Sequence, residues 1–405
     1  MKILLVTDAY PPEIRSASHL MQELAEELRD RGHSITVGTC FPRYNLSDAV
    51  PSANFEELSI ENGIRVIRIH TLPHHKVNFL IRGISQLTLP LFFWLKVRPY
   101  LKDGVDAVLV YSPPLPLWQI GFKAKKMHGA RFILNVQDIF PQNAVDLGAL
   151  RNPILIRFFE RMERSAYNHT DIVTVHSRSN KEFLIREKSV PSEKVVTLHN
   201  WVNMRNDKQP VRSNGFRKRW GQEDKFIFFF GGVMGPSQGL DLLIDAANML
   251  KKEKDIVILL VGDGSEKERL QELARHNALK NVVFHPFVSK EDYQLLLKEV
   301  NVGLICLNSR NKTPVVPGKI LGYMAAGIPV LAFLNKESGG HEIIREAECG
   351  YSEVSDGTNK AVDLMLQMYK ERDRLKKLGI NGYNFAANHF SKKVCIDQLE
   401  QLMQK

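Results

Sequence analysis

The 405-residue chain has only four cysteines, and no two of them form a Cys-x-x-Cys pair. This spacing supports neither a zinc site nor a disulfide framework, and it is typical of proteins from a reducing compartment. No uncharged apolar run approaches the roughly 20 residues of a membrane-spanning helix. The opening MKILLV reaches Asp8 almost at once, which predicts a strand rather than a signal peptide. We therefore expect a cytoplasmic protein that is soluble or peripheral to a membrane.

Two common nucleotide-binding motifs are also missing. GGVMG, which follows an apolar run at 226–231, does not have the G-x-G-x-x-G spacing, and VGDGSEKERL keeps only the first two glycines. VPGKIL lacks both the spacing and the Ser/Thr of a P-loop. These absences disfavour a dehydrogenase that uses a dinucleotide and an ATPase.

Acidic residues are scarce in one stretch of a chain whose net charge is +10. None lies between Glu61 and Asp103, whereas seven Lys and Arg residues do. The same stretch carries LTLPLFFWLKV, with Phe92, Phe93 and Trp94 between basic flanks. This combination predicts a surface that meets anionic lipid headgroups and inserts these aromatic side chains beneath them. The alternative is a buried helix with a solvated basic end.

Strand-like apolar runs alternate with amphipathic helical runs along most of the chain. ASHLMQELAEELRDRG, for example, is predicted to form a helix that ends at Gly32. Such alternation is typical of βαβ units and of a parallel sheet covered on both faces. It is interrupted by a polar, basic segment at 203–222, which we interpret as an interdomain linker and hinge.

The predicted fold class is α/β, with two doubly wound, Rossmann-like domains that face each other across a cleft. We expect an N-terminal domain over 1–205, with a C-terminal helix at 382–405 packing back, and a second domain over 206–381. The helices expected in the second domain are 237–252, 265–278, 290–298 and 317–326. Ligands in open α/β sheets bind outside the carboxyl ends of the strands, so functional residues are expected there.

Three segments of the second domain have the chemistry of an anion site. GGVMGPSQGL is a glycine-rich loop whose backbone N–H groups can approach a ligand, and it leads into a helix expected to start near Ser237. SGGHEII at 338–344 is a second glycine-rich loop before a helix. Lys319 stands at the start of a third helix. Paired glycines are often only turns, and Lys319 alone could be a solvated residue. Together the three segments favour a phosphate site.

Two polar loops in the first domain also follow strands. DAYPPEIRSAS comes after the first strand, and NVQDIFPQ places Gln137 and Asp138 after the strand at 131–136. A carboxylate at this edge can orient a sugar hydroxyl or assist a proton transfer. The alternative is that Asp138 merely caps the next turn.

These loops together resemble the retaining GT-B glycosyltransferases of the group 1 family (family four), which contains sucrose synthase. The likeness covers nearly the whole chain, including RMERSAYNHTDIVTVHSRSNKEFL, GGVMGPSQGLDLLIDAANML and KILGYMAAGIPVLAF. The segments DIFP and NWV look most like the transferases of O-antigen, capsule and amino-sugar polysaccharide synthesis. The resemblance implies a nucleotide-sugar donor bound by the second domain, an acceptor bound by the first, retention of anomeric configuration, and no required metal.

Carried over position by position, the resemblance assigns roles to several residues. Lys319, Asp138 and Glu342 are the expected catalytic residues. The donor-binding residues are expected to be Gly232, Gly235, Gln238, Gly239, Gly262, Asp263, Phe287, Val288, Lys319, Gly339, Gly340 and Glu342. The acceptor-binding residues are expected to be Arg15, Ser16, His19, Gln137 and Asp138.

The chain departs from the family pattern at four places. Arg15 and Ser16 stand where many members have two glycines, and Gln137 stands where many have histidine. Val233 and Gln238 replace the usual Arg and Lys of the first phosphate loop, and Gly322 replaces the glutamate that usually binds ribose. Lys319 would then carry more of the diphosphate charge, and Arg15 and Lys312 are candidates to share it.

We therefore predict a metal-independent retaining transferase at the inner face of the cell membrane. It would move an N-acetylated hexosamine or deoxyhexosamine from UDP to a polyprenyl-diphosphate-linked or glycan acceptor. One alternative is an epimerase of the UDP-N-acetylglucosamine type on the same fold, and another is a non-catalytic glycan-binding scaffold. Nucleic-acid binding is disfavoured, because Phe216 and Trp220 are the only aromatic residues in the basic linker.

Overall fold

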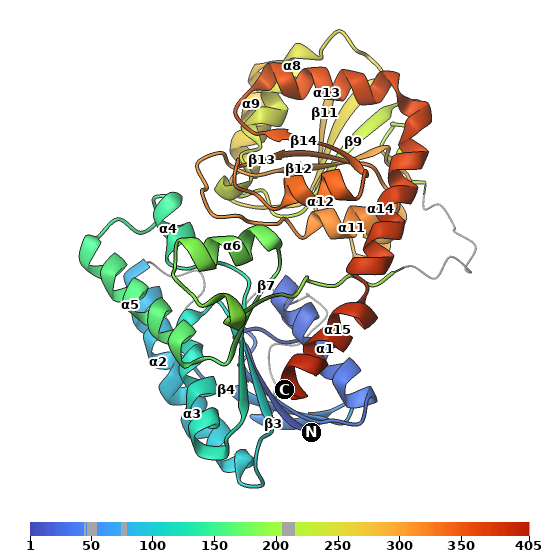
Figure 1. The fold of residues 1–405 in the computed structure, drawn as a ribbon. Coiled ribbons are helices and arrows are strands. Elements are labelled where there is room, and N and C mark those ends of the chain that lie inside the picture. The colour runs from blue at the N-terminus through green and yellow to red at the C-terminus, as the bar shows by residue number, and fades with distance from the viewer. Residues whose placement is uncertain (44–45, 47–54, 74–78, 205–214, 405) are drawn as a thin grey trace. The chain divides into compact units, whose positions relative to one another are not determined.

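The computed structural model describes residues 1–43, 46, 55–73, 79–204 and 215–404. The chain divides into two compact units, Met1–Asn200 with Cys395–Lys405, and Trp201–Val394. Each unit is a wholly or mainly parallel sheet with helices on its faces, as expected for doubly wound α/β domains (Figure 1). The chain passes between the units at 200/201 and again at 394/395. The first crossing lies a few residues before the boundary predicted at 205/206, and the second lies further along the chain than the boundary predicted at 381/382.

The first unit is built on an eight-stranded sheet in the order β3-β4-β2-β1-β5-β6-β7-β8. Every neighbouring pair is parallel except β3 and β4, which form an antiparallel edge. Strand β1, near the middle, is paired on both sides, and its residues Ile3 to Val6 are buried. The strands are β1 (Lys2–Val6), β2 (Ser34–Cys40), β3 (Leu58–Glu61), β4 (Ile64–Ile69), β5 (Ala107–Ser112), β6 (Arg131–Val136), β7 (Ile172–Val175) and β8 (Val195–Thr197).

Helices follow β1 and each strand from β4 to β7, and they cover this sheet. Three of them, α2, α3 and α5, pack in a row, with α3 in contact with both of the others (Figure 1). Helix α15 belongs to this unit through its residues from Cys395 onward, and its Glu400 accepts a 2.8 Å hydrogen bond from Arg31. The helices are α1 (Ser16–Asp30), α2 (Phe79–Val97), α3 (Trp118–His128), α4 (Gln142–Asp146), α5 (Pro153–His169), α6 (Arg178–Arg186) and α15 (Lys392–Gln404).

Helix α2 contains the aromatic segment that was predicted to insert into a membrane, and the structure corrects that prediction. Phe93 is fully buried in the core, and Phe92 and Trp94 are half-buried against it. Successive helical residues point about 100° apart, so three consecutive aromatic side chains cannot share one outward face. Among the side chains of α2 that the structure describes, the exposed apolar ones are instead Ile84, Leu87, Leu91 and Leu95. Within the described part of the chain, no helix is long and apolar enough to cross a bilayer.

The second unit is built on a six-stranded, all-parallel sheet in the order β11-β10-β9-β12-β13-β14. Its strands are β9 (Phe226–Gly231), β10 (Ile256–Val261), β11 (Val282–His285), β12 (Val302–Cys306), β13 (Val330–Leu334) and β14 (Gly350–Val354). Its helices are α7 (Phe216–Arg219), α8 (Asp241–Met249), α9 (Lys267–His276), α10 (Lys290–Leu296), α11 (Lys319–Ala325), α12 (Gly340–Glu346), α13 (Thr358–Lys370) and α14 (Leu375–His389).

Both faces of the second sheet are covered, as the continuous apolar runs predicted. Along β9, Phe228 and Phe230 join one hydrophobic cluster, whereas Ile227 and Phe229 join the cluster on the opposite face. Alternate side chains of a strand point to opposite faces, so this division means that helices bury both sides. The central strands β9 and β12 therefore hold their carboxyl ends in fixed positions.

The predicted linker at 203–222 is wrong for its second half. Residues 205–214 lie outside the described residues, but Phe216 is buried in the core of the second unit. The backbone N–H of Arg217 donates to Glu299, and its side chain donates to the side chain of Asn301. These contacts fix the segment from Gly215 onward to the second unit.

Candidate functional site

Lys319 opens α11 and lies against the loop that follows β9. Its ammonium nitrogen donates a 3.0 Å hydrogen bond to Oε1 of Gln238 and lies 4.8 Å from the centre of the Phe230 ring. A Cβ atom placed on Gly232 would be only 2.8 Å from Cε of Lys319, so the glycine makes room for this side chain. The structure thus brings together three positions, 232, 238 and 319, that the sequence singled out separately.

The loops after β9 and β10 lie back to back. Gly262 has φ of +152°, and a Cβ atom there would lie 1.9 Å from the carbonyl oxygen of Gly232. The Met234 N–H donates a 2.8 Å hydrogen bond to the carbonyl of Asp263, and the Gly262 N–H donates to the carbonyl of His285 at the end of β11. Both the close approach and the positive φ require glycine at position 262.

The helix after this loop starts later than predicted. Residues Pro236–Gln238 form a single 3₁₀ turn, Gly239 is left-handed at φ +59°, and α8 begins only at Asp241. The turn is tied to the loop after β12, because the Asn308 N–H donates a 2.9 Å hydrogen bond to the carbonyl of Ser237. Gly235 has φ of −116°, which any residue can adopt.

Gly339 and Gly340 lie at the start of the short helix α12, packed against the start of α11. A Cβ atom on Gly340 would lie 2.8 Å from Cδ1 of Ile320, so glycine allows the two helices to approach. Glu342 is half-buried in the first turn of α12. The neighbouring His341 is held by a 2.9 Å hydrogen bond to the hydroxyl of Ser352 on β14.

Aromatic and apolar residues lie at the end of β11, next to these loops. His285 stacks on Trp220 with ring centres 3.9 Å apart and planes 14° from parallel. Phe287 is 56% exposed, whereas Val288 is partly buried against the core. Of the two residues expected to contact a base, Phe287 is therefore the more exposed.

Electrostatics make Lys319 unusual among the cations of the second unit. Burial lowers the pKa of Lys319 to about 8. No carboxylate of the described residues lies within ion-pair distance of its ammonium group. A half-buried ammonium whose hydrogen-bond partner is a neutral amide retains an uncompensated charge, and an anionic ligand can neutralise it. Glycine loops and helix starts around it offer further N–H donors.

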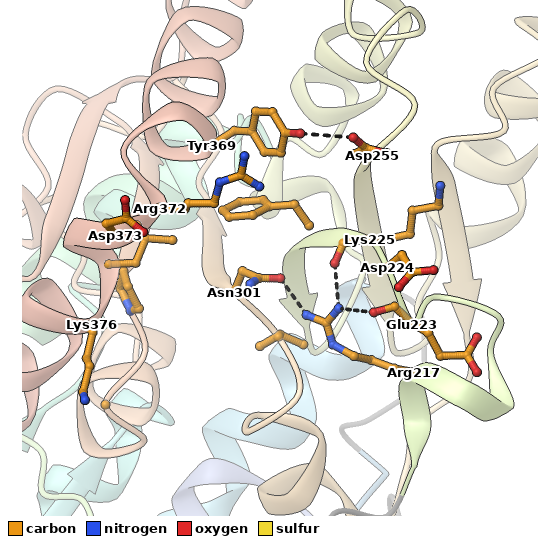
Figure 2. A pocket seen from close by; sticks show the side chains of 15 residues that line it. Arg217, Glu223, Asp224, Lys225, Asp255, Asn301, Tyr369, Arg372, Asp373 and Lys376 are labelled. Carbon is orange, nitrogen blue, oxygen red and sulfur yellow. Dashed lines mark hydrogen bonds between the residues drawn. The ribbon is translucent and has the colours of Figure 1, made fainter.

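A cavity of about 600 Å³ lies at the amino ends of the same strands (Figure 2). Arg217 lines it, and its guanidinium donates to Oδ1 of Asn301 and to the carbonyl oxygens of Lys225 and Glu223. Tyr369 donates to Asp255 on its far wall. Arg217 is thus occupied by protein groups, and the cavity lies at the edge of the sheet opposite to the glycine loops.

In the first unit, Asp138 follows β6 and lines an apolar cavity of about 420 Å³. The other walls come from α2, from the loop at 113–115, from the region of α4 and from α5, including Phe140, Phe158 and Phe159. Asp138 as a residue is exposed, but the surrounding protein displaces part of the hydration of its carboxyl group. This burial raises the pKa of Asp138 above its ordinary range.

Tyr111, which the sequence analysis did not identify, lies among the polar residues of this edge. Burial, followed by the nearby charges of Asp138 and Asp8, raises the pKa of Tyr111. It lies at the end of β5, which runs between β1 and β6 in the sheet, so its position at a carboxyl strand end was the available signal. Asp138, Asp8 and Tyr111 therefore share one edge of the sheet.

Arg15 is committed to carboxylates of its own unit. Its Nη1 lies 3.1 Å from Asp8 and 3.6 Å from Glu13, and both acidic side chains are almost completely buried. Its charge is therefore already balanced, which disfavours the suggestion that it shares the charge of a diphosphate. Ser16, the first residue of α1, is exposed, and His19 lies one turn along the same helix and is half-buried.

Gln137 is held in a reciprocal amide pair. Its Nε2 donates to Oδ1 of Asn200 at 3.0 Å, and Nδ2 of Asn200 donates back to Oε1 of Gln137 at 2.7 Å. Gln137 also donates to Asn135 on β6. A neutral amide with both ends bound neither accepts nor releases a proton at neutral pH, so the structure gives Gln137 no acid–base role.

Known proteins match both halves of the chain. The family Glycosyl transferases group 1 matches residues 213–385, and the Glycosyl transferase 4-like domain matches residues 17–201. WcaI of Escherichia coli K12, named as a putative glycosyl transferase of colanic acid biosynthesis, is 26% identical over 340 residues, which cover 81% of this chain and 82% of WcaI.

Solved structures with similar folds cover the whole chain. Sucrose-phosphate synthase from Thermosynechococcus elongatus superimposes with a TM-score of 0.79 at 16% identity, covering 100% of this chain and 98% of that one. HepE of Anabaena, solved in complex with UDP, gives a TM-score of 0.74 at 18% identity and covers 100% of both chains. With two family matches that span most of its length and the two-unit architecture that these structures share, the chain belongs to the group 1 glycosyltransferases of the GT-B fold.

Proposed function

We propose that the protein transfers a sugar from a UDP-sugar to an acceptor with retention of the anomeric configuration and without a metal ion. The observation that carries this proposal is Lys319, a half-buried cation whose recorded hydrogen-bond partner is the neutral Gln238. A leaving diphosphate would supply the missing negative charge. Fixed cations and N–H groups stabilise such a leaving group as a metal ion would, because the charge develops where they already point.

The donor would lie along the carboxyl edge of the second sheet. Its diphosphate would meet Lys319, the N–H groups of the loop at 232–239, and the first turn of α12. Its base would meet Phe287, and Glu342 would hold hydroxyl groups of the donor sugar. HepE was solved with UDP, which supports the choice of UDP as the nucleotide.

The acceptor would be bound by the first unit near Asp138. Because the cavity beside Asp138 is apolar, it suits an acceptor with an apolar part better than a free sugar. We therefore favour a lipid-linked acceptor, such as a polyprenyl-diphosphate-linked glycan, at the inner face of the cell membrane. WcaI supports a role in the synthesis of a surface polysaccharide, such as O-antigen or capsule.

Product analysis tests the reaction. The purified protein would be incubated with UDP-N-acetylglucosamine in EDTA and followed by proton NMR. Without an acceptor, water can take its place, and we expect slow release of UDP with the sugar initially in the α configuration. Release of the β anomer would contradict retention, whereas a UDP-linked epimer without hydrolysis would favour the epimerase. If the protein consumed neither UDP-N-acetylglucosamine nor any other UDP- or GDP-sugar, the non-catalytic scaffold would replace the transferase as the proposed function.

A further inference from the structure

The helix row α2, α3 and α5 carries an apolar stripe that stays exposed among the described residues. On α2, the exposed residues Ile84, Leu87, Leu91 and Leu95 recur every three or four positions and so lie along one side of the helix. Ile84 is 61% exposed and Leu95 is 62% exposed, so the stripe is open at both of its ends. It ends beside two exposed basic residues, Arg98 and Lys96, of which Lys96 forms a 2.6 Å ion pair with Glu57.

Helix α5 continues this surface and adds positive charge. Its exposed residues Ile154, Arg157, Phe158 and Arg161 follow the same spacing and share one side of the helix. Ile154 is 76% exposed and Phe158 is 43% exposed. Apolar and guanidinium groups thus alternate along a single helix face.

Acidic residues are almost missing from this row of helices. Helices α2 and α3 contain none, and α5 contains only Glu160, which is exposed, and Glu163. Glu163 is buried and forms a 3.1 Å ion pair with Lys188, so it does not reduce the surface charge of the row. On α3, Lys123 lies over the ring of Trp94 and Lys126 is exposed. The row is therefore strongly basic.

The apolar cavity beside Asp138 lies between the same helices. Ile84 and Leu87 of α2 and Phe158 of α5 line the cavity and are also exposed at the surface. The cavity therefore opens on the apolar side of the row. An amphiphile held at this surface would reach Asp138 along apolar side chains.

We propose that this surface, formed by Ile84, Leu87, Leu91 and Leu95 of α2 and by Ile154, Arg157, Phe158 and Arg161 of α5, docks on an anionic lipid bilayer. The aliphatic side chains and Phe158 enter the headgroup region, and the arginines bind lipid phosphates. Charge complementarity selects this partner, because an acidic headgroup layer matches an apolar surface with arginines on it. Docking itself is argued from the surface alone. Its role, which is to bring a lipid-linked acceptor to the cavity, rests on the proposed function.

Vesicle binding of the full chain tests the proposal. We expect co-sedimentation with vesicles of phosphatidylcholine and phosphatidylglycerol, little with phosphatidylcholine alone, and loss of binding as salt rises. The double variant Arg157→Gln/Arg161→Gln should lower the partition coefficient roughly 25-fold, since each basic residue contributes about fivefold. Leu91→Ser/Leu95→Ser should lower it roughly tenfold or more.

Matched controls lie on the second unit. Lys251→Gln/Lys252→Gln removes two exposed charges, and Ile380→Ser removes an apolar side chain that is 50% exposed. Neither should change vesicle binding. Equal losses in the controls, or full binding by both test variants, would overturn the proposal.

A fluorescent label locates the contact directly. All four native cysteines are buried, so Leu95→Cys provides a single accessible thiol for a polarity-sensitive dye. Anionic vesicles should shift its emission to the blue, whereas a dye on Ile380→Cys should not respond. An unshifted Leu95→Cys label on bound protein would contradict docking by this surface. UDP binding by the same variants should stay unchanged, so failure of docking is distinguishable from failure of the proposed transferase.

Discussion

The ammonium group of Lys319 donates a 3.0 Å hydrogen bond to the amide oxygen of Gln238, 81 positions earlier in the chain. This pair joins the start of α11 to the turn after β9. The partner is neutral, and burial lowers the pKa of Lys319 to about 8. A cation in such surroundings destabilises the protein until an anion binds, which makes its removal informative.

Lys319→Met should stabilise the ligand-free second unit. Below about pH 8 the lysine is charged in both the folded and the unfolded chain, and its burial costs about 3 kcal/mol. Between pH 8 and the ordinary pKa of 10.5 the folded form loses its proton first, so this penalty disappears as pH rises. Thermal unfolding should show the variant as more stable than wild type at pH 7 and close to wild type near pH 10.5. Lys280→Met, at an exposed site, should show no such gap, and a gap of the same size there would contradict the burial argument.

Gly262→Ala should disrupt the donor loops. Its Cβ atom would lie 1.9 Å from the carbonyl oxygen of Gly232, at a φ that L-residues rarely adopt. We expect the strands β9 and β10 to lose about 3 kcal/mol of stability, and UDP binding to fall below detection. Gly357→Ala is the matched control, because a Cβ atom there meets nothing within 4 Å. Normal UDP affinity in Gly262→Ala would mean that these loops do not bind the donor.

Phe287→Ala should weaken UDP binding without affecting stability. The side chain is 56% exposed, so little packing is lost, and stacking of an aromatic ring on a base contributes about 1–3 kcal/mol. Calorimetry should show an affinity for UDP that is lower by roughly tenfold. Met249→Ala, which truncates another exposed side chain of the same unit, serves as the control. Unchanged affinity would remove Phe287 from the base site.

Arg15→Met should act mainly on the stability of the first unit. The substitution leaves the buried carboxylates of Asp8 and Glu13 without the guanidinium that lies 3.1 and 3.6 Å from them. Loss of one partner of a buried ion pair costs about 3–5 kcal/mol. Arg374→Met breaks an exposed pair with Glu371 and should cost less than about 1 kcal/mol. Thermal unfolding would compare the two, and equal midpoints would contradict the structural role of Arg15.

Local pattern predicted much of the fold and part of the site. The parallel sheets follow from continuous apolar strands, and Gly32, at φ +86°, follows the end of α1 as its position predicted. The glycine loops were recognised because glycine readily allows a positive φ and a close approach of neighbouring atoms, and Gly232 and Gly262 show both features. Lys319 was singled out by its place at a helix start.

Contacts between distant side chains could not be predicted in this way. The amide pair of Gln137 and Asn200 joins residues 63 positions apart, and nothing in either local sequence indicates it. The ion pair of Arg15 with Asp8 lies in one loop, but its burial depends on the neighbouring strands. The exposed side of α2 was missed because the prediction rested on the aromatic residues between basic flanks, although helical spacing places these residues and the exposed leucines on different sides.

The most direct test of the central claim is calorimetric titration with UDP in EDTA, comparing wild type, Lys319→Ala and the exposed control Lys280→Ala. We predict binding by wild type and by Lys280→Ala, and a loss of affinity of roughly 30-fold or more in Lys319→Ala, since a charged hydrogen bond to phosphate contributes about 2–3 kcal/mol. Equal UDP affinity in all three proteins would contradict the assignment of Lys319 as the diphosphate ligand.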